Sequence, residues 1–176
     1  MTWHPDDFED LAAELRRRVG AEFTEEAAEL ERLTEIQRRR RSSLADAARS
    51  AMHRGDRVSL GCGERRWSGQ LVSVADDYVV LESGDSVVEA DLACVSLELV
   101  AARAGGRSGR PPSATWRARL LELEQNREEV EIYAPSMGLT MTGRVVLVAT
   151  DYVEIAERDR RVLLPSASLA AVIRPR

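Results

Sequence analysis

The sequence predicts an α+β protein in which an N-terminal helical arm precedes two tandem barrels, each built from one helix and five short strands. Three observations support this fold class: a 13-residue segment recurs, each copy follows an amphipathic helical stripe, and segments between turn signals alternate apolar and polar residues. The chain has 176 residues, 44% hydrophobic and 31% charged, with a net charge of −5. This composition excludes collagen-like, disordered and disulfide-rich proteins.

The recurring segment aligns residues 69–81 with residues 143–155 without a gap. The shared residues are Gly69/Gly143, Val72/Val146, Val74/Val148, Ala75/Ala149, Asp77/Asp151, Tyr78/Tyr152 and Val79/Val153. Weaker similarity extends upstream and downstream of both segments. We therefore expect four regions: a helical arm at 1–41, a first barrel at 42–100, a basic Gly/Pro linker at 101–112 and a second barrel at 113–176.

The arm is expected to be helical because apolar residues recur at helical spacing after Pro5, a residue that suits the start of a helix. These residues are Phe8, Leu11, Ala12, Leu15 and Val19, and a less regular pattern continues to Arg41. The arm is too polar to bury itself. We therefore expect it to pack on the barrels or on a partner helix.

Each copy is then expected to begin with a short helix. In the first copy, Ser43 and Asp46 have the spacing of a capping box, and Gly55 is suited to end the helix. The predicted buried stripes are Leu44, Ala47, Ala48 and Ala51 in the first copy, and Trp116, Leu120 and Leu123 in the second.

Short strands separated by turns follow each helix. In the first copy they are expected near 58–62, 67–74, 78–82, 87–88 and 95–99, with 89–92 as a connection. Five short antiparallel strands of this size usually close into a small barrel, because closure removes exposed edges.

Two glycine-centred patterns resemble the first motif of the Sm-like (LSm and Hfq-type) family. They are Gly69-x-Leu71-x-x-Val74 with Val79-Val-Leu81, and Gly143-x-Val145-x-x-Val148 with Val153-Glu-Ile155. In that motif a glycine allows the long second strand to bend, and residues 94–99 and 171–173 stand in place of the second motif. The turn before the third strand is one residue shorter than in the family and lacks its base-reading Asn, and the Arg-Gly element is absent. SH3-like or PRC-type barrels are the weaker match.

The resemblance implies a non-enzymatic protein that binds RNA and assembles through barrel edge strands. Sm barrels pair the fourth strand of one barrel with the fifth strand of the next, so two fused barrels would supply one such junction within the chain. We therefore expect a homo-oligomer, either a ring or a dimer. The alternatives are a protein-interaction adaptor or a DNA-associated regulator that oligomerises through its N-terminal helices.

The candidate nucleic-acid contacts come from charge and from the repeat. All 25 basic residues are arginine, residues 1–37 carry an excess of acidic residues, and residues 101–119 carry five arginines and no acid. Guanidinium groups can neutralise phosphates, tyrosine rings can stack on bases, and carboxylates can accept from exocyclic amines. The alternative for each Asp-Tyr pair is turn chemistry with a packed strand residue. The candidates are Arg38, Arg39, Arg40, Arg41, Arg103, Arg107, Arg110, Asp77, Tyr78, Asp151 and Tyr152.

Enzyme, metal and membrane chemistry find little support in the sequence. Two cysteines (Cys62, Cys94) and two histidines (His4, His53) do not match a zinc site, and no catalytic constellation or phosphate loop is visible. We expect no cofactor and no small-molecule substrate. Because no signal peptide or membrane-spanning run is visible, we expect a cytoplasmic protein with reduced thiols.

Overall fold

The computed structural model describes residues 28–101 and 113–176 of a chain that divides into two compact units, Met1–Ser42 and Ser43–Arg176. In the first unit, residues 28–41 are helical, as predicted for this part of the arm. The remainder of the predicted arm and most of the predicted linker lie outside the described residues.

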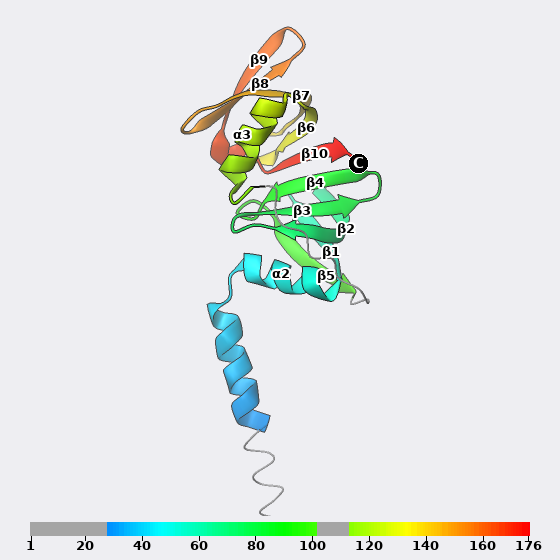
Figure 1. Ribbon diagram of the computed structural model, residues 1–176, viewed down its shortest axis with the longest axis vertical. Coiled ribbons are helices and arrows are strands. Elements are labelled where there is room, and N and C mark those ends of the chain that lie inside the picture. The colour runs from blue at the N-terminus through cyan, green and yellow to red at the C-terminus, as the bar shows by residue number, and fades with distance from the viewer. Residues whose placement is uncertain (1–27, 102–112) are drawn as a thin grey trace, which may run out of the picture. The chain divides into compact units, whose positions relative to one another are not determined.

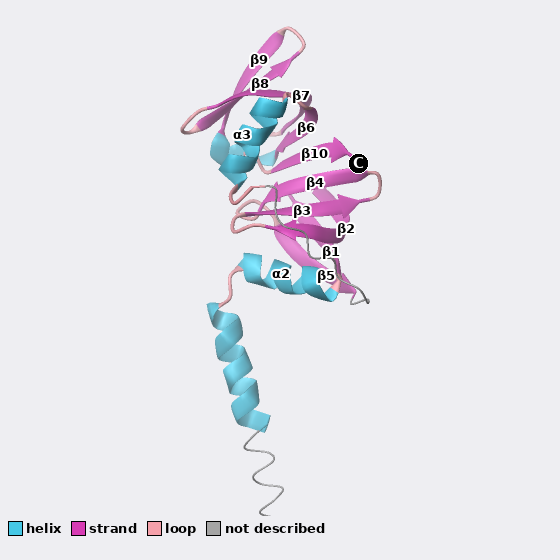
Figure 2. Ribbon diagram, in the orientation of Figure 1, coloured by secondary structure: helices cyan, strands magenta, loops and turns pink. Residues whose placement is uncertain are grey.

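In the described part of the second unit, ten strands form one antiparallel sheet in the order β5-β1-β2-β3-β4-β10-β6-β7-β8-β9 (Figure 1). The strands are β1 (Arg57–Cys62), β2 (Arg65–Val74), β3 (Tyr78–Ser83), β4 (Ser86–Asp91), β5 (Ser96–Ala101), β6 (Glu129–Ala134), β7 (Leu139–Val148), β8 (Tyr152–Glu157), β9 (Arg160–Pro165) and β10 (Ala171–Pro175). The helical elements are α2 (Leu44–Arg54), α3 (Trp116–Asn126), and the short 3-10 helices η1 (Pro135–Met137) and η2 (Ser166–Ser168) (Figure 2).

The prediction of two tandem helix-plus-five-strand barrels is wrong. Each copy contributes one helix and five strands, but neither set closes on itself, and together they form a single open sheet. The edge of β4 is covered by β10 from the other copy, rather than by β5 of its own. The reasoning that strands must close to remove edges therefore failed, because one copy covers an edge of the other.

Helix α2 begins at the predicted capping box. The Ser43 hydroxyl oxygen accepts from the Asp46 N–H at 3.1 Å, and the Ser43 N–H donates to Asp46 Oδ2 at 2.9 Å. Gly55 ends the helix with a left-handed φ of 74°. The predicted stripe is partly wrong: Leu44 and Ala47 are exposed, whereas the buried residues are Ala45, Ala48, Ala51 and Met52. In α3 the predicted stripe of Trp116, Leu120 and Leu123 is confirmed as buried.

The repeated glycine of the long strands is needed for space. A Cβ on Gly69 would stand 1.8 Å from the carbonyl oxygen of Glu82, and one on Gly143 would stand 2.6 Å from that of Ala156. The register irregularities lie further along, between Leu71 and Ser73 in β2 and between Val145 and Leu147 in β7. The glycine therefore admits the backbone of the next strand, and the bulge lies two or more residues later.

Two hydrophobic clusters form the core, and each contains side chains from both copies. The first cluster gathers α2 and the strands of the first copy, and it includes Tyr133 and Ala171 of the second. The second cluster gathers α3 and the strands of the second copy, and it includes Tyr78, Val80 and Val87 of the first. Because the two copies share core residues, Ser43–Arg176 is one compact unit.

Candidate functional site

The strand junction between the two copies is the first part of the candidate site. β4 and β10 pair antiparallel with Val172 opposite Glu89 and Arg174 opposite Val87. In Figure 1 the red β10 accordingly lies between the green β4 and the yellow β6. The fourth strand of the first copy therefore accepts the fifth strand of the second, and this pairing makes the sheet continuous.

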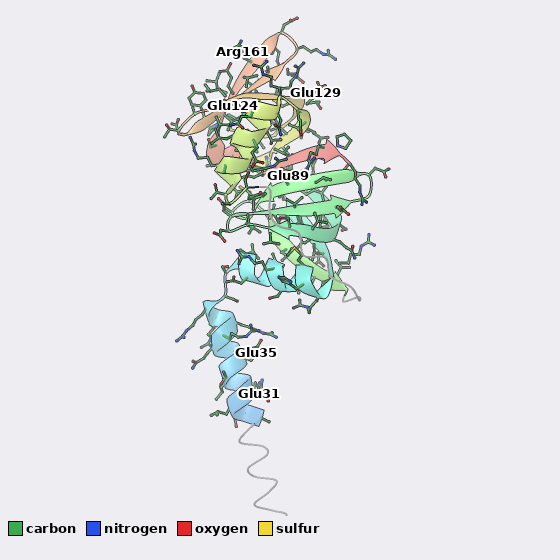
Figure 3. All side chains as sticks on the ribbon, in the orientation of Figure 1. Glu31, Glu35, Glu89, Glu124, Glu129 and Arg161 are labelled. Carbon is green, nitrogen blue, oxygen red and sulfur yellow. The ribbon has the colours of Figure 1, made fainter. Side chains whose placement is uncertain are left out.

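A buried cluster of charges lies on this junction, around Glu89, which is labelled in Figure 3. The Glu89 carboxylate is fully buried and accepts from Arg119 Nε at 2.6 Å, Arg119 Nη2 at 2.9 Å and Arg174 Nε at 3.1 Å. Arg119 also donates to Glu122 Oε2 at 2.8 Å. The two carboxylates therefore balance the two guanidinium groups, which a buried ion cluster requires.

Two members of this cluster, Arg119 and Glu122, have pKa values that favour their ionised forms. Burial lowers the pKa of Arg119, but hydrogen bonds and charge attraction from Glu89 and Glu122 exceed this effect and raise it overall. The hydrogen bond from the Ser113 hydroxyl and the nearby Arg119 lower the pKa of Glu122, against the opposing effect of burial. The junction is thus tied together by fixed charges from α3, β4 and β10.

Asp77 and Tyr78 join the first copy to the start of α3. Asp77 Oδ1 accepts from the Trp116 N–H at 2.7 Å. The Tyr78 hydroxyl donates to the Ser113 carbonyl at 3.0 Å, and its ring centroid lies 5.8 Å from that of Trp116. Because Tyr78 is fully buried, it has no exposed ring face on which a base could stack. The contacts of this pair match the alternative given for it, turn chemistry with a packed strand residue.

Asp151 and Tyr152 occupy the same turn in the second copy. The Ser166 N–H donates to the Asp151 carbonyl at 2.8 Å, as the Leu92 N–H does to the Asp77 carbonyl at 2.8 Å. Asp151 is nevertheless exposed and Tyr152 is only half-buried. The repeat therefore presents at the end of the sheet the same turn that is covered at the internal junction.

The predicted arginine sites fall in different parts of the chain. Arg38 and Arg39 form ion pairs with Glu35 (labelled in Figure 3), and their hydrogen bonds lower the pKa of Glu35 to about 2. Arg40 and Arg41 are exposed on the same helical segment. The remaining candidates, Arg103, Arg107 and Arg110, lie outside the described residues.

A pocket lined by three arginines was missed in the sequence. It has a volume of about 570 Å³ and is lined by Arg127, Arg144 and Arg158, with Glu124 beside them. Arg127 and Arg158 have left-handed backbones, with φ of 55° and 51°. The first copy has Gly55 and Gly84 at these repeat positions, with φ of 74° and 60°. A left-handed arginine costs about 1–2 kcal/mol, so comparison of the two copies could have revealed the substitution.

Glu89 was also missed, because the sequence pattern places it in a connection between strands. It stands in β4, and its partners are 30 and 85 positions away along the chain. The repeat could have shown that Glu89 lies in a strand, because the residue at the same repeat position in the second copy is Leu163, which lies in β9.

Comparison with known proteins does not assign this chain to a family. No family model matches the chain, and no curated protein matches it at a significant level, so the resemblance to the Sm-like family stays a prediction. Within the described residues, no helix is long and apolar enough to cross a membrane. The same residues contain no group of three or more His, Cys, Asp or Glu side chains that could hold a metal ion.

Proposed function

We propose that this is a non-enzymatic, RNA-binding protein whose copies assemble through the end strands of the sheet. The observation that carries the assembly is the β4–β10 junction, where a fourth strand accepts a fifth strand from the other copy. The two end strands of the described sheet, β5 and β9, are again a fifth and a fourth strand. The same pairing can therefore repeat between chains, because an unpaired strand edge is a template for another strand.

Such a contact joins two different surfaces, so it is heterologous and closes into a ring when the rotation permits. Light scattering across a range of concentrations should give one discrete multiple of the 19.5 kDa chain mass. A synthetic peptide covering residues 94–101 should compete for the β9 edge and lower that mass, whereas a scrambled peptide should not. A chain that is still monomeric at a concentration of about 100 μM would refute the assembly.

RNA binding is supported by exposed guanidinium groups. Arg40 and Arg41 are exposed on the helical segment, and the three-arginine pocket of Arg127, Arg144 and Arg158 adds a second basic surface. Replacing the three pocket arginines with Gln should weaken binding to short single-stranded RNA and reduce its salt dependence, by about 0.7 in the log–log slope per lost phosphate contact.

The matched control replaces Arg57 and Arg176, which line the corresponding pocket of the first copy beside Glu82, with Gln. This control should leave RNA binding nearly unchanged, because Gly55 and Gly84 stand in that pocket in place of two arginines and Arg176 is paired with Glu82 at 3.3 Å. Equal RNA affinity in wild type and the pocket variant would contradict the assignment to this pocket. The absence of any RNA binding at low salt would contradict the RNA function as a whole.

A protein-interaction adaptor is the second candidate, and exposed apolar residues on the helical segment favour it. Leu30, Leu33 and Ile36 are 70%, 51% and 37% exposed within residues 28–41. Such residues can form the contact of paired helices. Replacing all three with Glu in the full chain should abolish an assembly made by helix pairing, and it should leave one made by sheet edges intact.

A cytoplasmic location completes the proposal. Both cysteines of the chain lie in the described residues and are free thiols, which fits a reducing compartment.

A further inference from the structure

The charged residues of the internal junction have apolar counterparts at the two open ends of the sheet. Tyr78 pairs with Asp91 and Tyr152 with Pro165, so Leu163 of β9 takes the place of Glu89. Helices α2 and α3 both have 11 residues, so Ala47 takes the place of Arg119.

The register of the fifth strands gives the third counterpart. Leu60 of β1 and Ile132 of β6 hold the same place in the repeat, and they pair with Leu97 and Val172 respectively. Two residues further on, Leu99 of β5 therefore takes the place of Arg174. The internal set of Glu89, Arg119 and Arg174 thus corresponds to Leu163, Ala47 and Leu99.

These counterparts are exposed in the single chain. Leu163 is 58% exposed, Leu99 is 57% exposed, and Ala47 is also exposed. Apart from Leu121 and Met137, every exposed large apolar side chain described in Ser43–Arg176 belongs to the elements at one of the two ends of the sheet. Those on α2 and β5 are Leu44, Leu99 and Val100, and those on β7 and β9 are Val146, Leu147 and Leu163.

We infer that a second copy of this chain docks its β5 and the start of its α2 on β9 and the Asp151–Tyr152 turn, in the register of the β4–β10 junction. The inference rests on the proposed assembly and specifies its surfaces. Leu97 of one copy then lies opposite Leu163 of the next, as Val172 lies opposite Glu89 inside the chain. The exposed Leu44 takes the place of Trp116 and packs on Tyr152.

The start of α2 fits this arrangement in its polar groups as well. Inside the chain, Asp77 accepts from the N–H of Trp116, the first residue of α3. Leu44 is the first residue of α2, and its N–H is among those that a helix leaves without an internal partner. In the docked pair the exposed Asp151 accepts from this Leu44 N–H.

One difference between the two junctions requires accommodation. Val80 and Val87 of the internal junction correspond to Glu154 and Arg161, which form an ion pair at 2.9 Å. Arg161, labelled on β9 in Figure 3, then lies opposite Leu99 of the docked copy. Its aliphatic stem can cover Leu99 while its guanidinium group stays with Glu154.

The difference between charged and apolar sets makes the two junctions non-interchangeable. If β10 of one chain paired with β9 of another, Arg119 and Arg174 would meet Leu163 in place of Glu89, and Arg174 would lose its carboxylate partner. If β5 of another chain paired with β4, Glu89 would be buried against leucine. Each exchange leaves a buried charge unpaired, which is strongly unfavourable. The charged set therefore keeps β10 in its own chain and leaves β5 for the neighbour.

A charge exchange between two variants tests this docking. Leu163→Glu places a carboxylate on one surface, and Ala47→Arg places a guanidinium group on the other, as Glu89 and Arg119 do inside the chain. Each variant alone meets an apolar partner surface, so its dissociation constant should rise at least about 100-fold. When mixed, the two variants should associate with each other in equal numbers, because alternating chains leave every junction either apolar on both sides or charged on both sides.

Three measurements make the outcome decisive. Far-ultraviolet circular dichroism and thermal unfolding check that the variants stay folded, which is expected because both positions are exposed. Leu121→Glu, on an exposed position of α3 outside both sets, is the control and should assemble like wild type. Variants that assemble alone, or a mixture that stays dissociated, would overturn this docking while leaving the proposed assembly intact. A wild-type chain that is monomeric would instead remove the proposed assembly itself.

Discussion

Replacing Glu89 with Gln should strongly destabilise the sheet, although it changes the shape of the side chain very little. The carboxylate is fully buried and accepts three hydrogen bonds from Arg119 and Arg174. The amide has the same shape, but its NH2 group would point at guanidinium donors, and Arg119 and Arg174 would share only the charge of Glu122. The variant therefore keeps the volume of the site and loses its charge balance.

Removing one partner of a buried ion pair costs about 3–5 kcal/mol. We expect the lower half of this range, because the Arg174 side chain is 35% exposed and water can solvate part of its charge. Domains have a total stability of about 5–15 kcal/mol, so the loss is a large fraction of it. With a urea m-value of about 2 kcal/mol per molar, the unfolding midpoint should fall by roughly 1.5–2 M.

The assay is urea unfolding followed by circular dichroism, with Leu163→Gln as the matched control at the same repeat position. Since Leu163 is exposed, that change should alter the stability of the isolated chain by less than about 0.5 kcal/mol. Replacing the set by its counterparts, Glu89→Leu with Arg119→Ala and Arg174→Leu, should cost less than Glu89→Gln alone, because the charge that then loses its ion-pair partner is Glu122, whose side chain is 36% exposed. A loss below about 1 kcal/mol for Glu89→Gln would refute the reasoning.

Three other changes test the rest of the junction and the sheet by the same unfolding assay. Gly69→Ala should cost more than about 3 kcal/mol, because its Cβ would stand 1.8 Å from a backbone oxygen, whereas Ser86→Ala should cost far less. Asp77→Ala should cost about 1 kcal/mol by removing the acceptor at the start of α3, and the exposed Asp151→Ala should cost almost nothing in the monomer. Burial raises the pKa of Tyr78 above its ordinary value of 10.0, so the folded state holds the phenol proton more tightly than the unfolded chain. The stability that this provides is complete below about pH 10 and is lost as the pH rises through the folded pKa. Unfolding midpoints measured from pH 9 to 11 should show this loss in wild type and in Tyr152→Phe, and a smaller loss in Tyr78→Phe.

The elements could be predicted because their signals are local. The capping box of Ser43 and Asp46, the stripe of α3, and the alternation within β1 and β6 all depend on residues a few positions apart. The repeat also placed corresponding strands in the two copies. In α2 the four alanines left the buried face ambiguous, because small side chains on either side of the helix give similar patterns.

The pairing of edges could not be predicted from such signals. Whether β4 meets β5 or β10 depends on the shape of the assembled unit, and both fifth strands are short and apolar. Similarly, the sequence left open whether Tyr78 is packed or exposed, because its partners, Ser113 and Trp116, belong to the other copy. Shared residues of the repeat indicated that the turn mattered, but they did not indicate whether it binds a ligand or the next copy.

Each of the two copies has a fourth-strand edge and a fifth-strand edge, so any fourth strand could pair with any fifth strand. A chain with two identical junction surfaces would form mixtures of swapped and open arrangements, because all pairings would have the same free energy. In the proposed assembly, charges at the internal junction and leucines at the junction between chains remove this equality, since only one combination leaves no charge buried alone. The Glu89 cluster then contributes less to stability than a well-packed apolar set would, and more to the selection of partners. The cost of that selection is an exposed leucine surface on every free chain, which should make the isolated chain the least soluble form of the protein.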